Sequence, residues 1–522
     1  MSGPNASARK HPLATPVLIL LLILAVFTPL FHGGLTPLAG LVSQLIALAL
    51  LTLVLWAPSR LVLRPPEAIL LVLLLLVPVV YLLPLPAQWI DALPGRTLYT
   101  KAQALLASAD ANGGLPLSLV PSATVTAGLA LLLPVAAFLG VRCLDERRIL
   151  TLLQVVLAIA AIQAIIGVIQ FGTAQTGNPL LAIDGGHAGS GTGLYLNRNH
   201  LAGLLEMVLP IALALFFFSL GRGEASQATG RWRRKAAFVS SVQGHAALIY
   251  GALAVLLVIG AVFSRSRTGI FLTMLGILLS TFLFARRIGG SNAFGSTGTL
   301  FALAGAFAVT IGLAPVLERF SVSQLADEGR WPLFERALQG AATFFPFGSG
   351  PGTFPSTFPP FQPLELGNVF VNRAHNDYIE WLFDAGAVGV AIPLAIFLLY
   401  LYQWTRVYSA GAWPRARFLQ AGAGIGLLLL ALHEFVDYNL YTPANQLVFA
   451  ILAGLFFMPP SRLADGAPEH RRRTRRTQRL ETPAAPESPA AAKPPPDQIE
   501  NPFRTPPTPA GEGQSRQHIP PS

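Results

Sequence analysis

Histidine and arginine are the residue types in this sequence that suit chemistry on a phosphorylated substrate. His375 lies in the run Arg373-Ala374-His375-Asn376-Asp377-Tyr378. An imidazole titrates near neutral pH and can take the proton of an attacking hydroxyl group. We therefore interpret His375 as the candidate general base; the alternative is a histidine that only caps or packs a loop.

Arginines occur in the run Ser264-Arg265-Ser266-Arg267. A guanidinium group is a planar fork of permanent charge that fits phosphate oxygens and does not shuttle protons. Residues two apart on a helix point roughly 200° away from each other. Arg265 and Arg267 can therefore share one anion only if this segment is not helical, and the alternative is that each binds a lipid phosphate at the membrane interface.

Spacing relates several other polar residues. His433 and Asp437 are four apart and predict a simple orienting pair. His375 and Tyr378 are three apart and predict one shared helical face, and Asn376 with Glu380 predicts another. The candidate substrate-binding residues are Arg198, Arg267, Arg373, Asn376, Tyr378, His433 and Asp437.

The sequence predicts no metal site and no cofactor. It has neither an H-E-x-x-H motif nor a D-x-D aspartate pair, and its single cysteine, Cys143, excludes a cysteine-based metal site. The segment Gly348-Ser349-Gly350-Pro351-Gly352 is rich in glycine but lacks the lysine of a phosphate-binding loop. We expect a tight turn there.

Composition places the chain in a membrane. Only 12% of the residues are charged, 53% are hydrophobic, and the mean hydropathy is +0.56. A soluble chain of 522 residues needs far more polar surface. The net charge of +11 lies largely between short apolar runs and in the arginine-rich stretch 471–479. Membrane lipids are therefore expected partners, and nucleic acid is not.

Apolar runs predict an all-α polytopic membrane protein of about twelve transmembrane helices, since about 20 residues span a hydrocarbon core of roughly 30 Å. The expected windows are 15–33, 36–57, 67–85, 123–141, 149–171, 199–219, 245–263, 268–285, 297–315, 385–404, 417–433 and 440–457.

Lysine and arginine predict the orientation, because short translocated loops are poor in them. Most of the 36 fall on the side that holds both termini, which we expect in the cytoplasm. The polar clusters then meet at the periplasmic interface, where ionisable residues are costly and are functional candidates. The expected parts are a cytoplasmic segment 1–14, helices one to nine in 15–315, a partly helical periplasmic loop 316–384, helices ten to twelve in 385–457, and a disordered Pro/Arg-rich cytoplasmic tail 458–522.

The run around His375 resembles a family signature. His375-Asn376, nine residues and then Gly386-Ala387-Val388-Gly389 are similar to the H-[NSQ]-x9-G-x-x-G pattern of the bacterial O-antigen ligase family. That superfamily also includes O-antigen polymerases and bacterial protein O-oligosaccharyltransferases. The segments 197–200, 264–267 and 348–354 resemble it as well, and the resemblance covers roughly 190–455.

The resemblance implies a metal-independent, inverting transfer of a glycan from undecaprenyl diphosphate to an acceptor hydroxyl at the periplasmic face of the inner membrane. It implies that Arg265 holds the donor diphosphate and that His375 activates or orients the acceptor. Arg198, Arg267 and Arg373 are weaker candidates for the same phosphates. The lipid A core is the favoured acceptor, and a growing polysaccharide or a protein is the alternative. A transporter of lipid-linked glycans is an alternative of another class, which the largely apolar helix centres disfavour.

Overall fold

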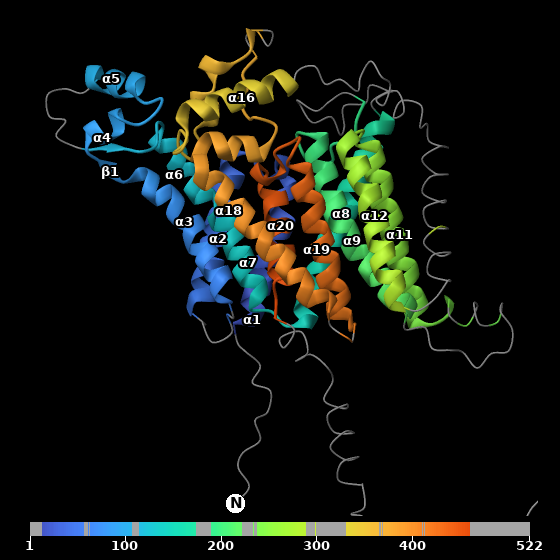
Figure 1. The fold of residues 1–522 in the computed structure, drawn as a ribbon. Helices are drawn as coiled ribbons and strands as arrows, with labels where there is room; N and C mark the ends of the chain where they lie inside the picture. Colours follow the sequence, from blue (N-terminus) through green and yellow to red (C-terminus); the bar gives the residue numbers. More distant parts are fainter. Residues whose placement is uncertain are drawn as a thin grey trace, which may run out of the picture. The chain divides into compact units, whose positions relative to one another are not determined.

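The computed structural model describes residues 13–56, 61, 63–106, 114–173, 189–221, 233, 237, 239–288, 298, 330–364, 367, 369–409, 411 and 413–459. Almost all of the predicted window 297–315, the first twelve residues and the tail after 459 lie outside these ranges. Within them, regular structure is helical except for one antiparallel pair of two-residue strands, β1 (Pro84–Leu85) and β2 (Leu115–Pro116) (Figure 1). The expected all-α class is confirmed.

Nine helices in the described ranges are long and apolar enough to cross a membrane. They are α2 (Pro37–Trp56), α3 (Pro65–Leu82), α6 with α7 (Pro121–Ala130 and Leu132–Arg142), α8 (Glu146–Thr173), α9 (Arg198–Gly221), α11 (Val242–Phe263), α12 (Arg267–Ile288), α18 (Asp377–Tyr408) and α19 (Arg415–His433).

Two shorter apolar helices, α1 (Ala14–Phe27) and α20 (Pro443–Phe456), complete the apolar set in the same ranges. Each of these eleven units overlaps one predicted window. The chain is a multi-pass membrane protein.

Prolines define several helix ends. Pro65, Pro121 and Pro443 begin α3, α6 and α20, where the missing N–H of proline costs no hydrogen bond. Pro134 explains the break between α6 and α7, because a proline ring clashes with the carbonyl group four residues earlier, and α6 ends at Ala130. The window predicted as one helix is therefore two consecutive helices.

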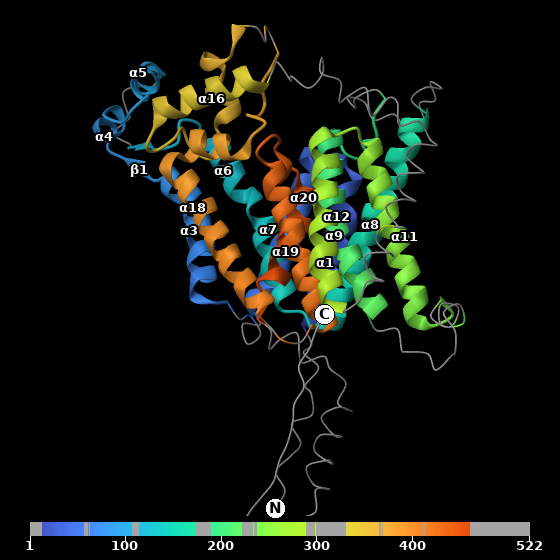
Figure 2. The same ribbon diagram turned by 45° about the vertical axis from the view of Figure 1, so that its right-hand side comes forward.

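Helix α9 lies at the centre of the bundle. In its most apolar window 94% of the residues are buried, and it packs against α8, α11, α12 and α19 (Figure 2). The start of α12 packs on the start of α9, because an added Cβ at Gly269 would lie 2.4 Å from the Ala202 Cβ. The ends of the two helices also meet, at Gly221 and Ile288. The two helices therefore run in the same direction.

The longest described connection folds over one end of the helices (Figure 1). It contains α16 (Arg330–Phe344), α17 (Phe354–Thr357) and η5 (Pro359–Phe361), and α16 packs against α18. Phe344, Phe354, Phe358 and Phe383 form a separate apolar cluster there. We call this end of the bundle the α16 end and the other the opposite end. The remaining short elements are η1 (Thr28–Leu30), η2 (His32–Gly34), α4 (Ala87–Asp91), α5 (Thr97–Leu106) and η7 (Asn439–Tyr441).

Helix α18 begins at Asp377, eight residues before the predicted window at 385. Its first turns carry Asp377, Glu380 and Asp384, all buried, and so lack the apolar run by which a spanning helix is found. The connection between α16 and α18 provides polar partners for these side chains. Asp384 accepts hydrogen bonds from the Gly352 N–H at 2.7 Å and from the Thr353 hydroxyl at 3.4 Å.

Candidate active site

His375 lies in the turn that leads into α18, and its backbone is left-handed, with φ of 52°. This conformation costs a non-glycine residue roughly 1–2 kcal/mol, so neighbouring contacts must hold it. Asn376 caps α18: its Oδ1 accepts from the Ile379 N–H at 3.1 Å, and its Nδ2 donates to Phe435 O at 2.8 Å. The predicted helical face shared by His375 and Tyr378 is wrong, because the helix begins only after His375.

Asp437 lies between two histidines and is fully buried. Its Oδ1 is 4.0 Å from His375 Nδ1 and 3.8 Å from His200 Nε2. Asn199 Nδ2 donates to Oδ2, and the Tyr438 N–H donates to Oδ1 at 2.9 Å. A carboxylate in this position can orient an imidazole and stabilise the imidazolium that forms when the ring takes a proton.

His200 is a member of this cluster that the sequence did not single out. Its Nδ1 is 2.9 Å from Thr442 Oγ1, and its ring lies edge-on to the Tyr438 ring, at 4.9 Å between centroids. The ring of His375 has the same edge-on relation to Tyr438, also at 4.9 Å. No local spacing relates residues 200, 375 and 437, so only the fold brings them together.

Arg265 also has left-handed backbone, with φ of 57°; among the described residues, the other non-glycine residue with positive φ is His32, in η2 at the same end. Arg265 Nη1 donates to Gly189 O at 3.0 Å, in the segment before α9. Its Nε is buried and has no hydrogen-bond partner among the described residues. The turn that holds Arg265 is not helical, and α12 starts at Arg267. The non-helical geometry needed for two arginines to share an anion is therefore present.

Among the helices that begin at this end are α9 at Arg198, α12 at Arg267 and α18 at Asp377. The contacts between Asn199 and Asp437 and between the Asp377 N–H and Glu434 O, at 3.0 Å, place these starts around the same turn. The N-terminus of a helix carries a partial positive charge of roughly half a unit. Helices α11 and α19 end at the same turns, at Phe263 and His433, so the helix termini bring partial charges of both signs, and the net positive charge here comes from the arginine side chains.

Arg373 is engaged within the protein. Its Nη1 is 2.7 Å from Glu380 Oε1, and its guanidinium carbon lies 3.6 Å from the centroid of the Tyr441 ring. Burial alone would lower the pKa of Arg373, but Tyr441 and Glu380 outweigh it and raise that pKa. Glu380 also accepts from the Ala374 N–H at 2.8 Å, so the pair fixes the backbone next to His375.

The predicted pairing of His433 with Asp437 is wrong. His433 ends α19, and its Nδ1 lies 2.8 Å from Glu206 Oε1 on α9, whereas Asp437 lies beyond the helix end, near His375 and His200. The four-residue rule fails because α19 stops between the two residues. Glu206 was missed by the sequence analysis: it is a fully buried carboxyl group within the most buried helix.

Glu434 and Tyr378 connect α18 to α19. The Tyr378 hydroxyl donates to Ala431 O at 2.7 Å, and Glu434 Oε2 accepts from the Asn439 N–H at 2.8 Å. Burial raises the pKa of Glu434 to about 8, so this carboxyl group holds a proton at neutral pH. The hydrogen bond from Tyr378 to α19 supports the turn near His375.

Steric clashes explain why both signature positions, 386 and 389, are glycine. Gly386 interrupts the helical backbone of α18 with φ of 57° and ψ of −133°, and an added Cβ would lie 2.0 Å from Pro346 O. A Cβ at Gly389 would lie 1.9 Å from Trp381 O. Gly386 therefore brings the backbone of α18 against the segment 346–350, and so holds the helix whose start follows His375.

The α16 end thus brings together His375, Asp437, Asn376 and Tyr378, and it also holds Arg198, Arg265, Arg267 and Arg373. His433 is displaced toward Glu206. The expected tight turn at 348–352 is present, with positive φ at Gly348, Gly350 and Gly352. Within the described ranges, no three histidine, cysteine, aspartate or glutamate side chains form a group that could hold a metal ion.

The spanning helices and this polar site define the class: a multi-pass membrane protein with histidine and arginine side chains at one end of its bundle. Residues 252–394 match the family model described as O-antigen ligase, so the resemblance seen in the sequence is confirmed for that part of the chain. The domain supports a membrane glycosyl transferase of the ligase or polymerase type. The match includes Arg265 and His375 and ends before His433 and Asp437. The curated proteins contain no match to this chain.

Proposed function

We propose that this protein transfers a glycan from an undecaprenyl-diphosphate carrier to an acceptor hydroxyl at the periplasmic face of the bacterial inner membrane. The observation that carries the proposal is that Arg265 and His375, which both have left-handed backbone, lie at the same end of the bundle, the α16 end. Backbone strain of this kind collects at functional sites, and both residues lie in the stretch that matches the ligase family.

His375 acts as the general base. The acceptor oxygen attacks the anomeric carbon of the donor sugar on the face opposite the diphosphate, while the hydroxyl proton passes to the His375 imidazole. Asp437, at 4.0 Å from His375 Nδ1, stabilises the imidazolium that results. Attack from the opposite face inverts the configuration at the anomeric carbon.

Arg265 binds the diphosphate leaving group. As the bond between the sugar and the diphosphate breaks, negative charge builds up on the phosphate oxygens, and a fixed guanidinium group stabilises it most at that moment. Nη1 of Arg265 donates to Gly189 O, and the guanidinium group has further N–H donors for this purpose. Arg198, at the start of α9, and Arg267, at the start of α12, add positive charge at the same end of the bundle. The proposed transfer is metal-independent.

The proposed acceptor is the lipid A core. Addition of repeat units to a growing O-antigen or exopolysaccharide is the second candidate, because the matching domain is common to ligase and polymerase types. The chemistry at His375 and Arg265 is the same in both cases, and only the molecule that presents the hydroxyl group differs.

A deletion strain tests the proposal. We expect the lipid A core to lose its glycan while undecaprenyl-linked glycan accumulates, and we expect the wild-type gene but not His375→Ala to restore transfer. If long polymer is lost but single repeat units are still attached to the lipid A core, the protein is a polymerase. If a protein loses its glycan, the acceptor is a protein. A strain in which every glycan conjugate is unchanged contradicts the proposal.

A further inference from the structure

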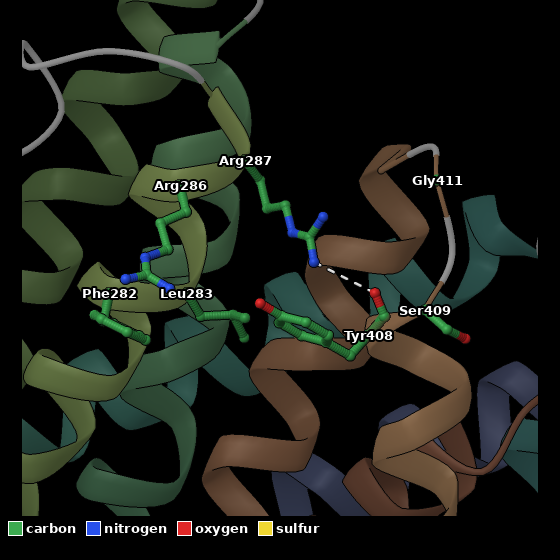
Figure 3. Close-up of a pocket in the computed structure, with 7 residues that line it drawn as sticks. All are labelled: Phe282, Leu283, Arg286, Arg287, Tyr408, Ser409 and Gly411. Atoms are coloured by element: carbon green, nitrogen blue, oxygen red, sulfur yellow. Dashed lines mark hydrogen bonds between the residues drawn. The ribbon is translucent and has the colours of Figure 1, made fainter.

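A pocket of about 420 Å³ lies at the opposite end of the bundle from His375, where α12 and α18 finish (Figure 3). Its lining combines two cations with aromatic, aliphatic and hydroxyl side chains. The lining residues used below are Phe282, Leu283, Arg286, Arg287, Tyr408 and Ser409.

Among the described residues, the two arginines of this pocket have no carboxylate partner. Within the described residues, neither Arg286 nor Arg287 forms an ion pair. The guanidinium carbon of Arg286 lies 3.8 Å from the centroid of the Phe282 ring. Stacking on a ring uses the flat face of a guanidinium group and leaves its N–H edges free to donate. Figure 3 shows the Arg286 side chain lying over Phe282 at the rim of the pocket.

Arg287 lies on the other side of the pocket, next to Tyr408. Its Nη2 donates to Tyr408 O at 3.3 Å, and its guanidinium carbon lies 4.6 Å from the Tyr408 ring centroid and 4.5 Å from that of Trp413. A guanidinium group has five N–H donors, so one hydrogen bond leaves others available. Arg287 thus holds α12 beside α18 and still contributes charge to the pocket.

The charge balance favours an anion. Helices α9, α12 and α18 all end here, and each helix C-terminus carries a partial negative charge of about half a unit. Two arginines offset these three ends and leave a net charge of about +0.5. Neutralisation of helix ends therefore accounts for only part of the positive charge.

A stripe of exposed apolar side chains leads along α12 to the pocket. Phe271, Met274, Leu278 and Phe282 are all exposed, at the spacing of one helical face, and Arg286 continues the same face. Met274 lies about 18 Å along the axis from Arg286, which is close to the roughly 15 Å of one leaflet of hydrocarbon. An apolar track that ends at a cation matches an acyl chain that ends at a phosphate.

We infer that this pocket binds the phosphodiester headgroup of an anionic phospholipid from the adjoining leaflet, with the guanidinium edges of Arg286 and Arg287 on the phosphate and an acyl chain along the α12 stripe. The bound lipid joins the ends of α12 and α18. These helices begin, at their other ends, at Arg267 and next to His375, so the site is separate from the proposed transfer site.

Native mass spectrometry of the purified full-length protein tests this inference. The probes are phosphatidylglycerol and phosphatidylcholine with matched acyl chains, and inorganic phosphate is the competitor. The variants are Arg286→Gln, Arg286→Lys and the control Arg406→Gln, which removes an exposed arginine near the end of α18 that does not line the pocket.

We expect a preference for phosphatidylglycerol that falls roughly fivefold in Arg286→Gln, the factor expected for one basic residue near an anionic headgroup. Arg286→Lys should keep part of the preference, Arg406→Gln should keep all of it, and inorganic phosphate should not displace the lipid. Equal losses in Arg286→Gln and Arg406→Gln, no loss in either, or displacement by inorganic phosphate overturns the inference.

Discussion

Each end of the helix bundle buries a cluster of charged residues, and the two clusters differ in kind. At the opposite end, Glu67 lies 2.6 Å from Arg64 Nη2 and 2.8 Å from Arg142 Nη2, and Arg142 Nη1 also donates to Phe457 O at 2.6 Å. Carboxylate and guanidinium groups face each other directly there, and the backbone of the helices is regular.

At the α16 end, the carboxylate of Asp437 faces imidazoles instead of arginines, and His375 and Arg265 have left-handed backbone. The side chain of His375 is 30% exposed, whereas that of Arg142 is 1% exposed. Similar residue types therefore form a closed structural network at one end and an accessible, strained site at the other. Burial and charge alone do not distinguish the two clusters. They differ in whether the carboxylate faces titratable imidazoles, in backbone strain and in exposure of the side chains.

The largest difference is expected for His375→Ala. Loss of a general base reduces transfer by at least 100-fold, while expression and membrane insertion persist. His245→Ala is the matched control, because His245 is exposed at the start of α11, and it should transfer like wild type. A transfer assay with purified protein and lipid-linked donor measures both. Full activity of His375→Ala would remove His375 from the mechanism.

Glu67→Ala tests the structural network. It leaves Arg142 buried without its carboxylate, which costs about 3–5 kcal/mol of unfolding free energy. Glu146→Ala is the control, because its partner Arg415 is 36% exposed and the pair is worth about 1 kcal/mol or less. Thermal unfolding in detergent measures both losses. Transfer per folded molecule should be unchanged in Glu67→Ala, and a specific loss of transfer would show that the two ends are not independent in function.

The stability of the α16 end should depend on pH through Glu434. Its pKa is raised to about 8 in the folded protein, so between pH 5 and 8 the folded state holds a proton that the unfolded state releases. Unfolding free energy should therefore fall, by a few kcal/mol at most, as pH rises through this window. Glu434→Gln should weaken the dependence, and the exposed control Glu335→Gln should leave it intact. Stability that rises over the window in wild type would contradict the assignment.

Substitutions at Arg265 separate its charge from its backbone. Arg265→Lys keeps the charge but loses the planar fork, and transfer should fall by about tenfold or more. Arg265→Gly relieves the left-handed strain, so its unfolding midpoint should equal or exceed that of wild type while transfer is lost. Donor titration in the transfer assay gives the binding component. Wild-type donor binding and turnover in Arg265→Lys would exclude contact with the diphosphate.

The sequence predicted the bundle well because spanning helices leave a strong signal: eleven predicted windows overlap described apolar helices. It failed where buried polar residues remove that signal, as in the first turns of α18, where Asp377, Glu380 and Asp384 replace an apolar run. It found His375 and Arg265 from residue type and from a signature. It gave His200 no distinct role, missed Glu206 and mispaired His433, because their partners lie on other elements and local spacing carries no information about them.

Accessibility from outside the cell tests the central claim, that the site of His375 and Arg265 faces the periplasm. The single natural cysteine is buried, so Cys143→Ala provides a background without cysteine. Phe370→Cys then introduces an exposed thiol at the α16 end, and Ser409→Cys introduces one at the opposite end. A maleimide that cannot cross membranes should label Phe370→Cys in intact spheroplasts and Ser409→Cys only after lysis. The reverse pattern would place His375 on the cytoplasmic side and contradict the account.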